Sequence, residues 1–324
     1  MGGGSYDRDV GHSSSSGSFS SGGTSSSSAR SALGSRNQPD STKVNNRRIE
    51  SKKESPIVIN LDVTGSNIEF ARIVYDKAPM LYGQIEQQGY LKDFDICFSA
   101  TGDANSDDCP IQVCDFNTGI ELDNELKKLY LEGAGGGQRM ETYELSAYYF
   151  AHYCDIDNAK TPFIFFIVDE APYPNVTKRF IKEHMGDVVS ENVDSKQAFR
   201  DLFRAFHGNV FIFQNKYGNS DSHTDEIRLV WEEILGEEYK DHLIPITEEK
   251  SIVDLLLGII AMVSGSRSLT TYKTDMVSRG QSETRIEKVE KSLESISKAI
   301  VPRVKVDLPV DSKVSNKKTT ARKL

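Results

Sequence analysis

Short apolar runs separated by longer amphipathic stretches occupy the middle of the chain. The run Phe163–Val168 is apolar at every position, as a central parallel strand covered on both faces must be. Similar runs, some of them alternating, are bounded by polar or glycine-containing turns. The pattern predicts strands at 57–61, 94–98, 111–116, 163–168, 210–213 and 243–246.

Between these runs, apolar residues recur at spacings of three and four, which is typical of helices that bury one face. The spacing predicts helices at 67–87, 122–130, 143–153, 176–184, 196–206, 224–235 and 252–263. Pro79 lies inside the first of them and predicts a kink or a break there. Strands that alternate with helices indicate an α/β fold. We expect a doubly wound, mostly parallel sheet with helices on both faces.

Composition divides the 324 residues into five parts. Residues 1–55 are rich in Ser and Gly and predict a disordered tail. Residues 56–265 hold nearly all the apolar runs and predict one domain, and 266–281 would be a linker. An apolar stripe at 286–300 predicts an amphipathic helix over 282–301, which would dock on the core or a partner or support weak self-association. A basic disordered tail, 302–324, would follow.

Charge narrows the functional classes. Residues 56–265 contain 17 basic and 36 acidic residues, a net charge of −19, while the flanking segments are basic. An acidic domain is unsuited to gripping phosphate backbones, so we expect no nucleic acid at the core. No apolar run reaches the roughly 18 residues of a membrane span, and the N-terminus lacks an apolar signal core. Four scattered cysteines indicate reduced thiols, and we expect a cytoplasmic protein without membrane contact.

Oxygen-bearing side chains follow several predicted strands. The first strand ends in Asp62-Val-Thr64-Gly-Ser66, the central one is followed by Asp169, and Thr142 begins a helix after a glycine loop. Parallel strands present their carboxyl ends at one edge of a sheet, where ligands bind. Carboxylate and hydroxyl oxygens suit a hard cation, Mg²⁺ first, with Mn²⁺ or Ca²⁺ as alternatives. Each motif alone is also compatible with simple helix capping.

In this order the motifs resemble the metal-ion-dependent adhesion site (MIDAS) of von Willebrand factor A-type (vWA) domains. The resemblance covers about 55–265, and Thr64 stands where Ser is commoner, a variant associated with intracellular members. It implies that the Thr64 and Ser66 hydroxyls contact the metal and that Asp62 and Asp169 hold it partly through water. Thr142 would move toward or away from the metal, depending on whether a ligand is bound. The loop could also align so that Glu141 takes the place of Thr142.

The resemblance implies a non-enzymatic adaptor or scaffold whose metal recruits an Asp or Glu of a protein partner. Intracellular members are often linked to AAA+ ATPases or larger assemblies, which points to such a partner. One alternative is a metal-dependent phosphoester hydrolase with Glu170 as base; the other is a structural or particle-associated protein with a vestigial metal site. The sequence contains no phosphate-binding P-loop, and no catalytic residue is predicted.

Overall fold

A computed structural model describes residues 40–65, 68–131 and 139–300. Its centre is a six-stranded sheet in the order β12-β11-β7-β2-β3-β4. All neighbouring strands are parallel except β4, which runs antiparallel to β3. The strands are β2 Ser55–Asp62, β3 Phe94–Thr101, β4 Ile111–Val113, β7 Phe163–Val168, β11 Val210–Gln214 and β12 Leu243–Pro245.

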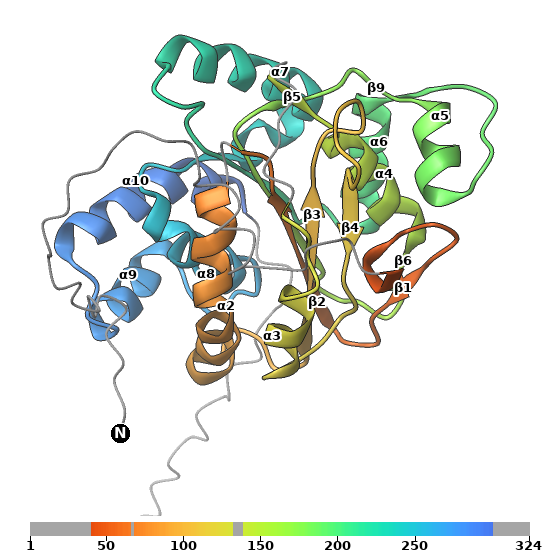
Figure 1. Cartoon of the computed structure of the whole chain (residues 1–324). Coiled ribbons are helices and arrows are strands. Elements are labelled where there is room, and N and C mark those ends of the chain that lie inside the picture. The colour runs from red at the N-terminus through yellow and green to blue at the C-terminus, as the bar shows by residue number, and fades with distance from the viewer. Residues whose placement is uncertain (1–39, 66–67, 132–138, 301–324) are drawn as a thin grey trace, which may run out of the picture.

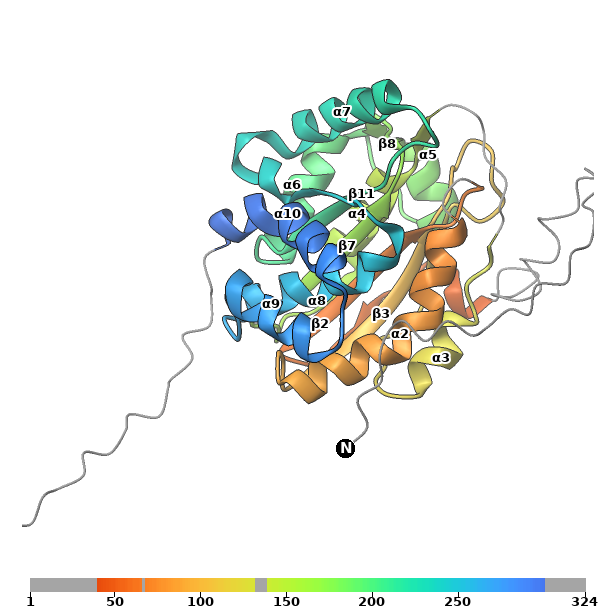
Figure 2. The ribbon, with the colours of Figure 1, turned by 90° about the vertical axis from the view of Figure 1, so that its left-hand side faces the viewer.

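Helices cover both faces of this sheet (Figures 1 and 2). One face carries α2 Ile68–Gln88, α3 Glu121–Leu126, α8 Ile252–Val263, α9 Leu269–Ser278 and α10 Glu283–Ala299. The other carries α4 Tyr143–Tyr153, α5 Lys178–Phe180, α6 Ser195–Ala205 and α7 Asp221–Tyr239. The predicted α/β fold, doubly wound around a mostly parallel sheet, is confirmed.

Strand alternation explains the two cores. In β7, Phe163, Phe165 and Ile167 pack with the α2–α8 side, while Ile164 and Phe166 pack with the α4–α6 side. Successive strand residues point to opposite faces, so a strand buried on both sides must be apolar at every position. This requirement is why the apolar runs located the strands.

Short elements complete the fold. Three two-stranded pairs join β1 Ile49–Glu50 to β6 Cys154–Asp155, β5 Met140–Glu141 to β8 Ala171–Pro172, and β9 Asn175–Val176 to β10 Val193–Asp194. Single turns of helix lie at η1 Asp40–Thr42, η2 Ile181–Met185, η3 Lys240–His242 and η4 Glu249–Ser251. Helix α2 continues through position 79 as one element, so Pro79 does not break it, and Figure 2 shows that the helix bends along its length.

The packed unit is longer than the predicted 56–265. Val44 and Ile49 are buried against the α4–α6 side, within the segment predicted as a disordered tail. Helix α9 occupies the predicted linker 266–281, and its Tyr272 is fully buried. The packed residues therefore extend beyond residue 56 on the N-terminal side and beyond residue 265 on the C-terminal side. Predictions for residues 1–39 and 301–324 fall outside the described residues.

The apolar stripe of α10 docks on the domain's own core. Ile286, Val289, Leu293 and Ile296 are all buried there, with α8 and α9 as neighbours. The expectation of docking on the core is met. The apolar stripe is thus covered by its own domain, and self-association through 286–300 stays a prediction.

Candidate metal centre at the carboxyl edge of the sheet

The parallel register brings acidic residues from neighbouring strands to one edge. Strand β2 lies between β7 and β3, and Leu61 pairs with Ile167 while Asp62 pairs with Thr101. Asp169 follows β7 directly and is therefore level with the end of β2. Asp62 and Asp169 are each 1% exposed, so both carboxyl groups are buried at this edge.

Three donors hold the carboxylate of Asp62. Its Oδ1 accepts hydrogen bonds from the backbone N–H of Thr64 at 2.9 Å and from the Thr64 hydroxyl at 2.6 Å. Its Oδ2 accepts a short hydrogen bond from the hydroxyl of Tyr143, the first residue of α4. The Thr64 proton is thus committed to Asp62, which leaves the lone pairs of the Thr64 oxygen as acceptors.

The hydroxyl of Thr142 is committed to the β3–β4 loop. It donates to the carbonyl oxygen of Gly102 at 2.5 Å and accepts from the backbone N–H of Ala104 at 3.3 Å. The Thr142 backbone N–H also donates to the Gly102 carbonyl, at 3.2 Å. Thr142 therefore fastens the start of α4 to this loop.

Glu141 presents the unusual feature of the site. It is 2% exposed, and its Oε2 has no hydrogen-bonding partner among the described residues. Burial, followed by the negative charges of Asp62 and Glu170, raises its pKa to about 11. A buried carboxyl oxygen without a partner is costly, because the group has lost water and gained nothing in exchange.

Glu170 and Asp103 extend the acidic cluster. Burial, then the charges of Asp62 and Asp103, raises the pKa of Glu170 to about 7, against a lowering by Arg139. Asp103 follows β3 and is 1% exposed. Its Oδ2 accepts from the hydroxyl of Tyr173 at 3.1 Å. Negative groups therefore approach the end of β2 from both neighbouring strands.

The structure thus brings together Asp62, Thr64 and Asp169 of the expected ligands. Thr142 lies at the site, but its hydroxyl is engaged elsewhere, and the adjacent Glu141 has the free oxygen. Ser66 lies outside the described residues. Sequence reasoning missed Tyr143, for which no sequence signal existed beyond its place at the start of a helix.

The carboxylate and hydroxyl oxygens at this edge are of the type that a small divalent cation prefers. Among the described residues, no group of three or more His, Cys, Asp or Glu side chains is arranged to hold a metal. Mg²⁺ keeps several waters and commonly uses only one or two protein carboxylates. A cation here would give Glu141 Oε2 the partner it lacks and would offset the repulsion among the buried acids.

Comparison with known proteins identifies no family. No family model and no curated protein matches the chain. Among solved structures, it is similar to the pilus adhesin SpaC from Lactobacillus rhamnosus GG (TM-score 0.47, 11% identity), over 67% of this chain and 31% of the adhesin. It is also similar to proximal thread matrix protein 1 of the mussel byssus (TM-score 0.38, 10% identity), over 66% of this chain and 49% of that protein. The chain thus spans about a third and about half of their lengths, and neither likeness bears on function.

Within the three described ranges, no helix has both the length and the apolarity needed to cross a bilayer.

Proposed function

We propose that this chain is a non-enzymatic, cytoplasmic binding module that holds Mg²⁺ at the carboxyl edge of its sheet and recruits an acidic side chain of a protein partner. The observation that carries the proposal is the buried, unpartnered Oε2 of Glu141 beside Asp62 and Glu170. An acidic cluster alone could be a solvated surface. A 2% exposed carboxyl aimed into such a cluster supports a cationic ligand instead.

The residues that would hold the metal differ in how far their oxygen atoms are already used as hydrogen-bond acceptors. The Thr64 hydroxyl oxygen and Glu141 Oε2 have acceptor capacity to spare, whereas both oxygens of Asp62 already accept hydrogen bonds. Asp62 would therefore act mainly by charge and by orienting Thr64. Asp169 adds a second buried carboxyl from the neighbouring strand.

The bound cation would supply positive charge and a coordination position that a hard oxygen can fill. Residues 56–265 carry a net charge of −19, so without a cation an approaching Asp or Glu is repelled by the excess of negative charge. The partner's acid and the metal are therefore expected to bind together. An AAA+ ATPase or another large assembly is the class of partner that the vWA resemblance suggests.

Titration calorimetry of the full chain with MgCl₂ tests the metal site. The wild type should bind, and Glu141→Gln should weaken binding by at least about tenfold because the amide carries no charge. Glu144→Gln is the matched control: Glu144 is equally buried and three positions away, but its Oε2 already accepts from the Tyr173 backbone N–H at 3.0 Å. Equal Mg²⁺ affinity in the wild type and in Glu141→Gln would remove the site from Glu141.

The hydrolase alternative makes a different prediction. A hydrolase needs a general base at the site, and Glu170 is the candidate. Release of p-nitrophenol from p-nitrophenyl phosphate in Mg²⁺, lost in Glu170→Gln, would replace the binding module with an enzyme. We expect no such release.

A further inference from the structure

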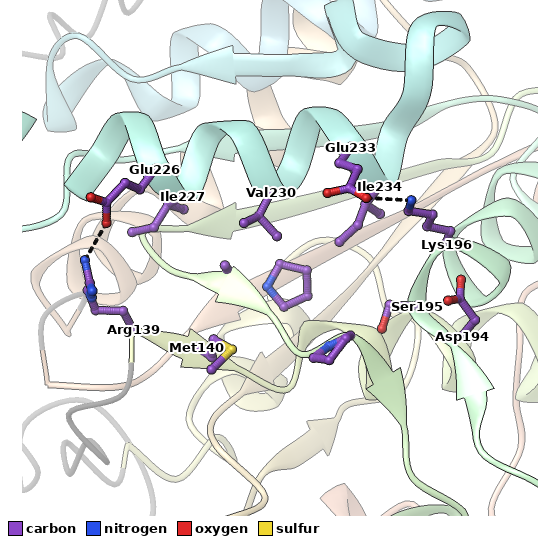
Figure 3. Close-up of a pocket in the computed structure, with 13 residues that line it drawn as sticks. Arg139, Met140, Asp194, Ser195, Lys196, Glu226, Ile227, Val230, Glu233 and Ile234 are labelled. Carbon is purple, nitrogen blue, oxygen red and sulfur yellow. Dashed lines mark hydrogen bonds and ion pairs between the residues drawn. The ribbon is translucent and has the colours of Figure 1, made fainter. Parts of the chain in front are cut away.

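A pocket of about 520 Å³ lies next to the acidic cluster at the carboxyl edge of the sheet, called the acidic edge below. It is enclosed by α7, the β5–β8 pair and the start of α6 (Figure 3). This volume is within the range of sites that enclose small ligands or several side chains. Its interior is mostly apolar. The apolar lining residues are Met140, Ala171, Pro172, Pro174, Ile227, Val230 and Ile234.

Ion pairs stand at the two ends of the pocket, as Figure 3 shows. Arg139 Nη1 lies 2.7 Å from Glu226 Oε2 at one end, and Lys196 Nζ lies 2.8 Å from Glu233 Oε1 at the other. Both pairs are substantially exposed and therefore contribute little to folding stability. They leave an apolar slot between two polar ends, open to solvent at Val230, which is 38% exposed.

The same elements, β5, β8 and α7, contribute residues to both the pocket and the acidic edge. Met140 and Glu141 are successive residues of β5, so their side chains point to opposite sides: Met140 lines the pocket and Glu141 faces the acids. On β8, Ala171 lines the pocket directly after Glu170. Trp231 of α7 donates from Nε1 to the Glu170 carbonyl oxygen at 2.9 Å, which fixes the pocket wall to the edge. Asp169 and Pro172 are three residues apart, and a chain of three residues spans at most about 10 Å.

We propose that this pocket receives an apolar side chain of the same partner segment whose acid is recruited at the metal. The inference rests on the proposed function and names the chemistry of the partner: an extended segment with an acidic residue, a leucine-like residue close to it, and basic flanks. The basic flanks follow from the excess of negative charge at α7. Its seven acidic residues are only partly offset by Arg228 within the helix and by four ion-paired bases beside it, Arg139, Lys196, Lys216 and Lys240. A second copy of this chain would bring two such acidic helices together, which like charges oppose.

The test measures binding of short fluorescein-labelled peptides to the full chain in Mg²⁺ by fluorescence anisotropy. Each peptide has a central glutamate, one leucine nearby at varied spacing, and lysines at both ends. Matched peptides replace the leucine with alanine or the glutamate with glutamine. Burying one leucine side chain corresponds to a change in affinity of about tenfold or more.

Two variants of adjacent α7 residues locate the contact. Val230→Asp places a charge at the pocket mouth and should weaken the leucine peptide about tenfold, without affecting the alanine peptide. Leu229→Asp makes the same chemical change one position away, at a 65% exposed residue that does not line the pocket, and should leave binding unchanged. Circular dichroism of both variants should match that of the wild type.

The outcomes separate the two proposals. Binding that needs Mg²⁺ and the glutamate but ignores both the leucine and Val230→Asp would overturn this inference and leave the proposed function standing. Leucine-dependent binding that persists in EDTA and with the glutamine peptide would overturn the proposed function, and with it the link between pocket and metal. The absence of any leucine-dependent binding, or a dimer that Val230→Asp dissociates, would also overturn the inference.

Discussion

The hydroxyl of Tyr143 donates a hydrogen bond to Oδ2 of Asp62, across 81 positions of sequence, and both side chains are buried. The contact links the first residue of α4 to the last residue of β2. It fixes the carboxylate whose other oxygen is held by Thr64. The orientation of the Asp62 carboxylate is thus set both by the packing of α4 against β2 and by the local turn at Thr64.

Removing this hydroxyl should loosen the site without unfolding the domain. We expect Tyr143→Phe to keep the ring in place but lower the free energy of unfolding by about 1.5–3 kcal/mol, because the acceptor is a carboxylate. Mg²⁺ affinity should fall about tenfold, as is usual when a residue that orients a ligand is lost. Tyr149→Phe on the same helix is the control, since its hydroxyl donates to the Arg47 carbonyl oxygen and not to a carboxylate of the described residues. Identical Mg²⁺ titrations of the two variants would contradict the role given to Tyr143.

Mg²⁺ should stabilise the native state by mass action. At a concentration of about 100 times Kd the gain is about 2.7 kcal/mol, measurable as a rise in Tm. Asp62→Ala should abolish this rise. Asp95→Asn, at the opposite end of the sheet where β3 begins, should retain it. The metal site would not involve Asp62 if Asp62→Ala responded to Mg²⁺ as the wild type does.

The packing of α10 on α8 predicts a stability change opposite to the one that helix propensity predicts. Propensity alone would make a Gly→Ala substitution within a helix stabilising. A Cβ at Gly258 of α8 would lie 2.6 Å from Leu293 Cδ1 of α10 and 2.9 Å from Tyr272 Cε1 of α9. Gly258→Ala should therefore destabilise by about 1–3 kcal/mol through overpacking. Gly83→Ala in α2 is the matched control: no atom lies within 4 Å of its Cβ position, so it should stabilise by up to about 1 kcal/mol. Urea unfolding measures both changes, and a stabilised Gly258→Ala would show that α9 and α10 are not seated as described.

Truncation tests the same packing on a larger scale. A fragment of residues 40–300 should unfold cooperatively, whereas 56–265 should expose the core that Tyr272, Met276 and Leu293 cover. We expect the shorter fragment to bind a hydrophobic dye and to lack a sharp thermal transition. Equal Tm values for the two fragments would support the domain boundary at residue 265 that the sequence predicts.

Stability should also depend on pH through Asp95. Burial raises its pKa from 3.8 to about 6, against the lowering effect of the Ser51 hydroxyl. The folded state therefore binds this proton more tightly than the unfolded state does. Its contribution to stability is greatest below pH 4 and is lost as the pH rises to about 6. Asp95→Asn should flatten the pH dependence of the unfolding free energy over this window.

Asp93→Asn is the control for that experiment. Its carboxylate is exposed, and the hydrogen bond from Lys53 lowers its pKa, so its own contribution has the opposite sign. We expect the slope between pH 4 and 6 to persist in this variant. A slope unchanged by Asp95→Asn would assign the effect to other groups.

The sequence by itself determined the six strands of the central sheet, most of its helices, and the edge of the sheet at which Asp62 and Asp169 lie. The apolar runs gave the order of strands and helices, because a strand buried on both faces must be apolar throughout, and this property is written in neighbouring residues. The spacing Asp62-x-Thr64 likewise encodes its own turn, since the carboxylate reaches a backbone only two residues away.

Only the tertiary structure decided which side chains meet. The pairing of β5 with β8 turns Glu141 toward the acids and Met140 toward the pocket, and a slip of one residue would reverse the two. Tyr143 reaches Asp62, and α9 and α10 close the core, through contacts between segments far apart in the chain. Such contacts depend on how whole elements pack against one another, and no local pattern of residues specifies them.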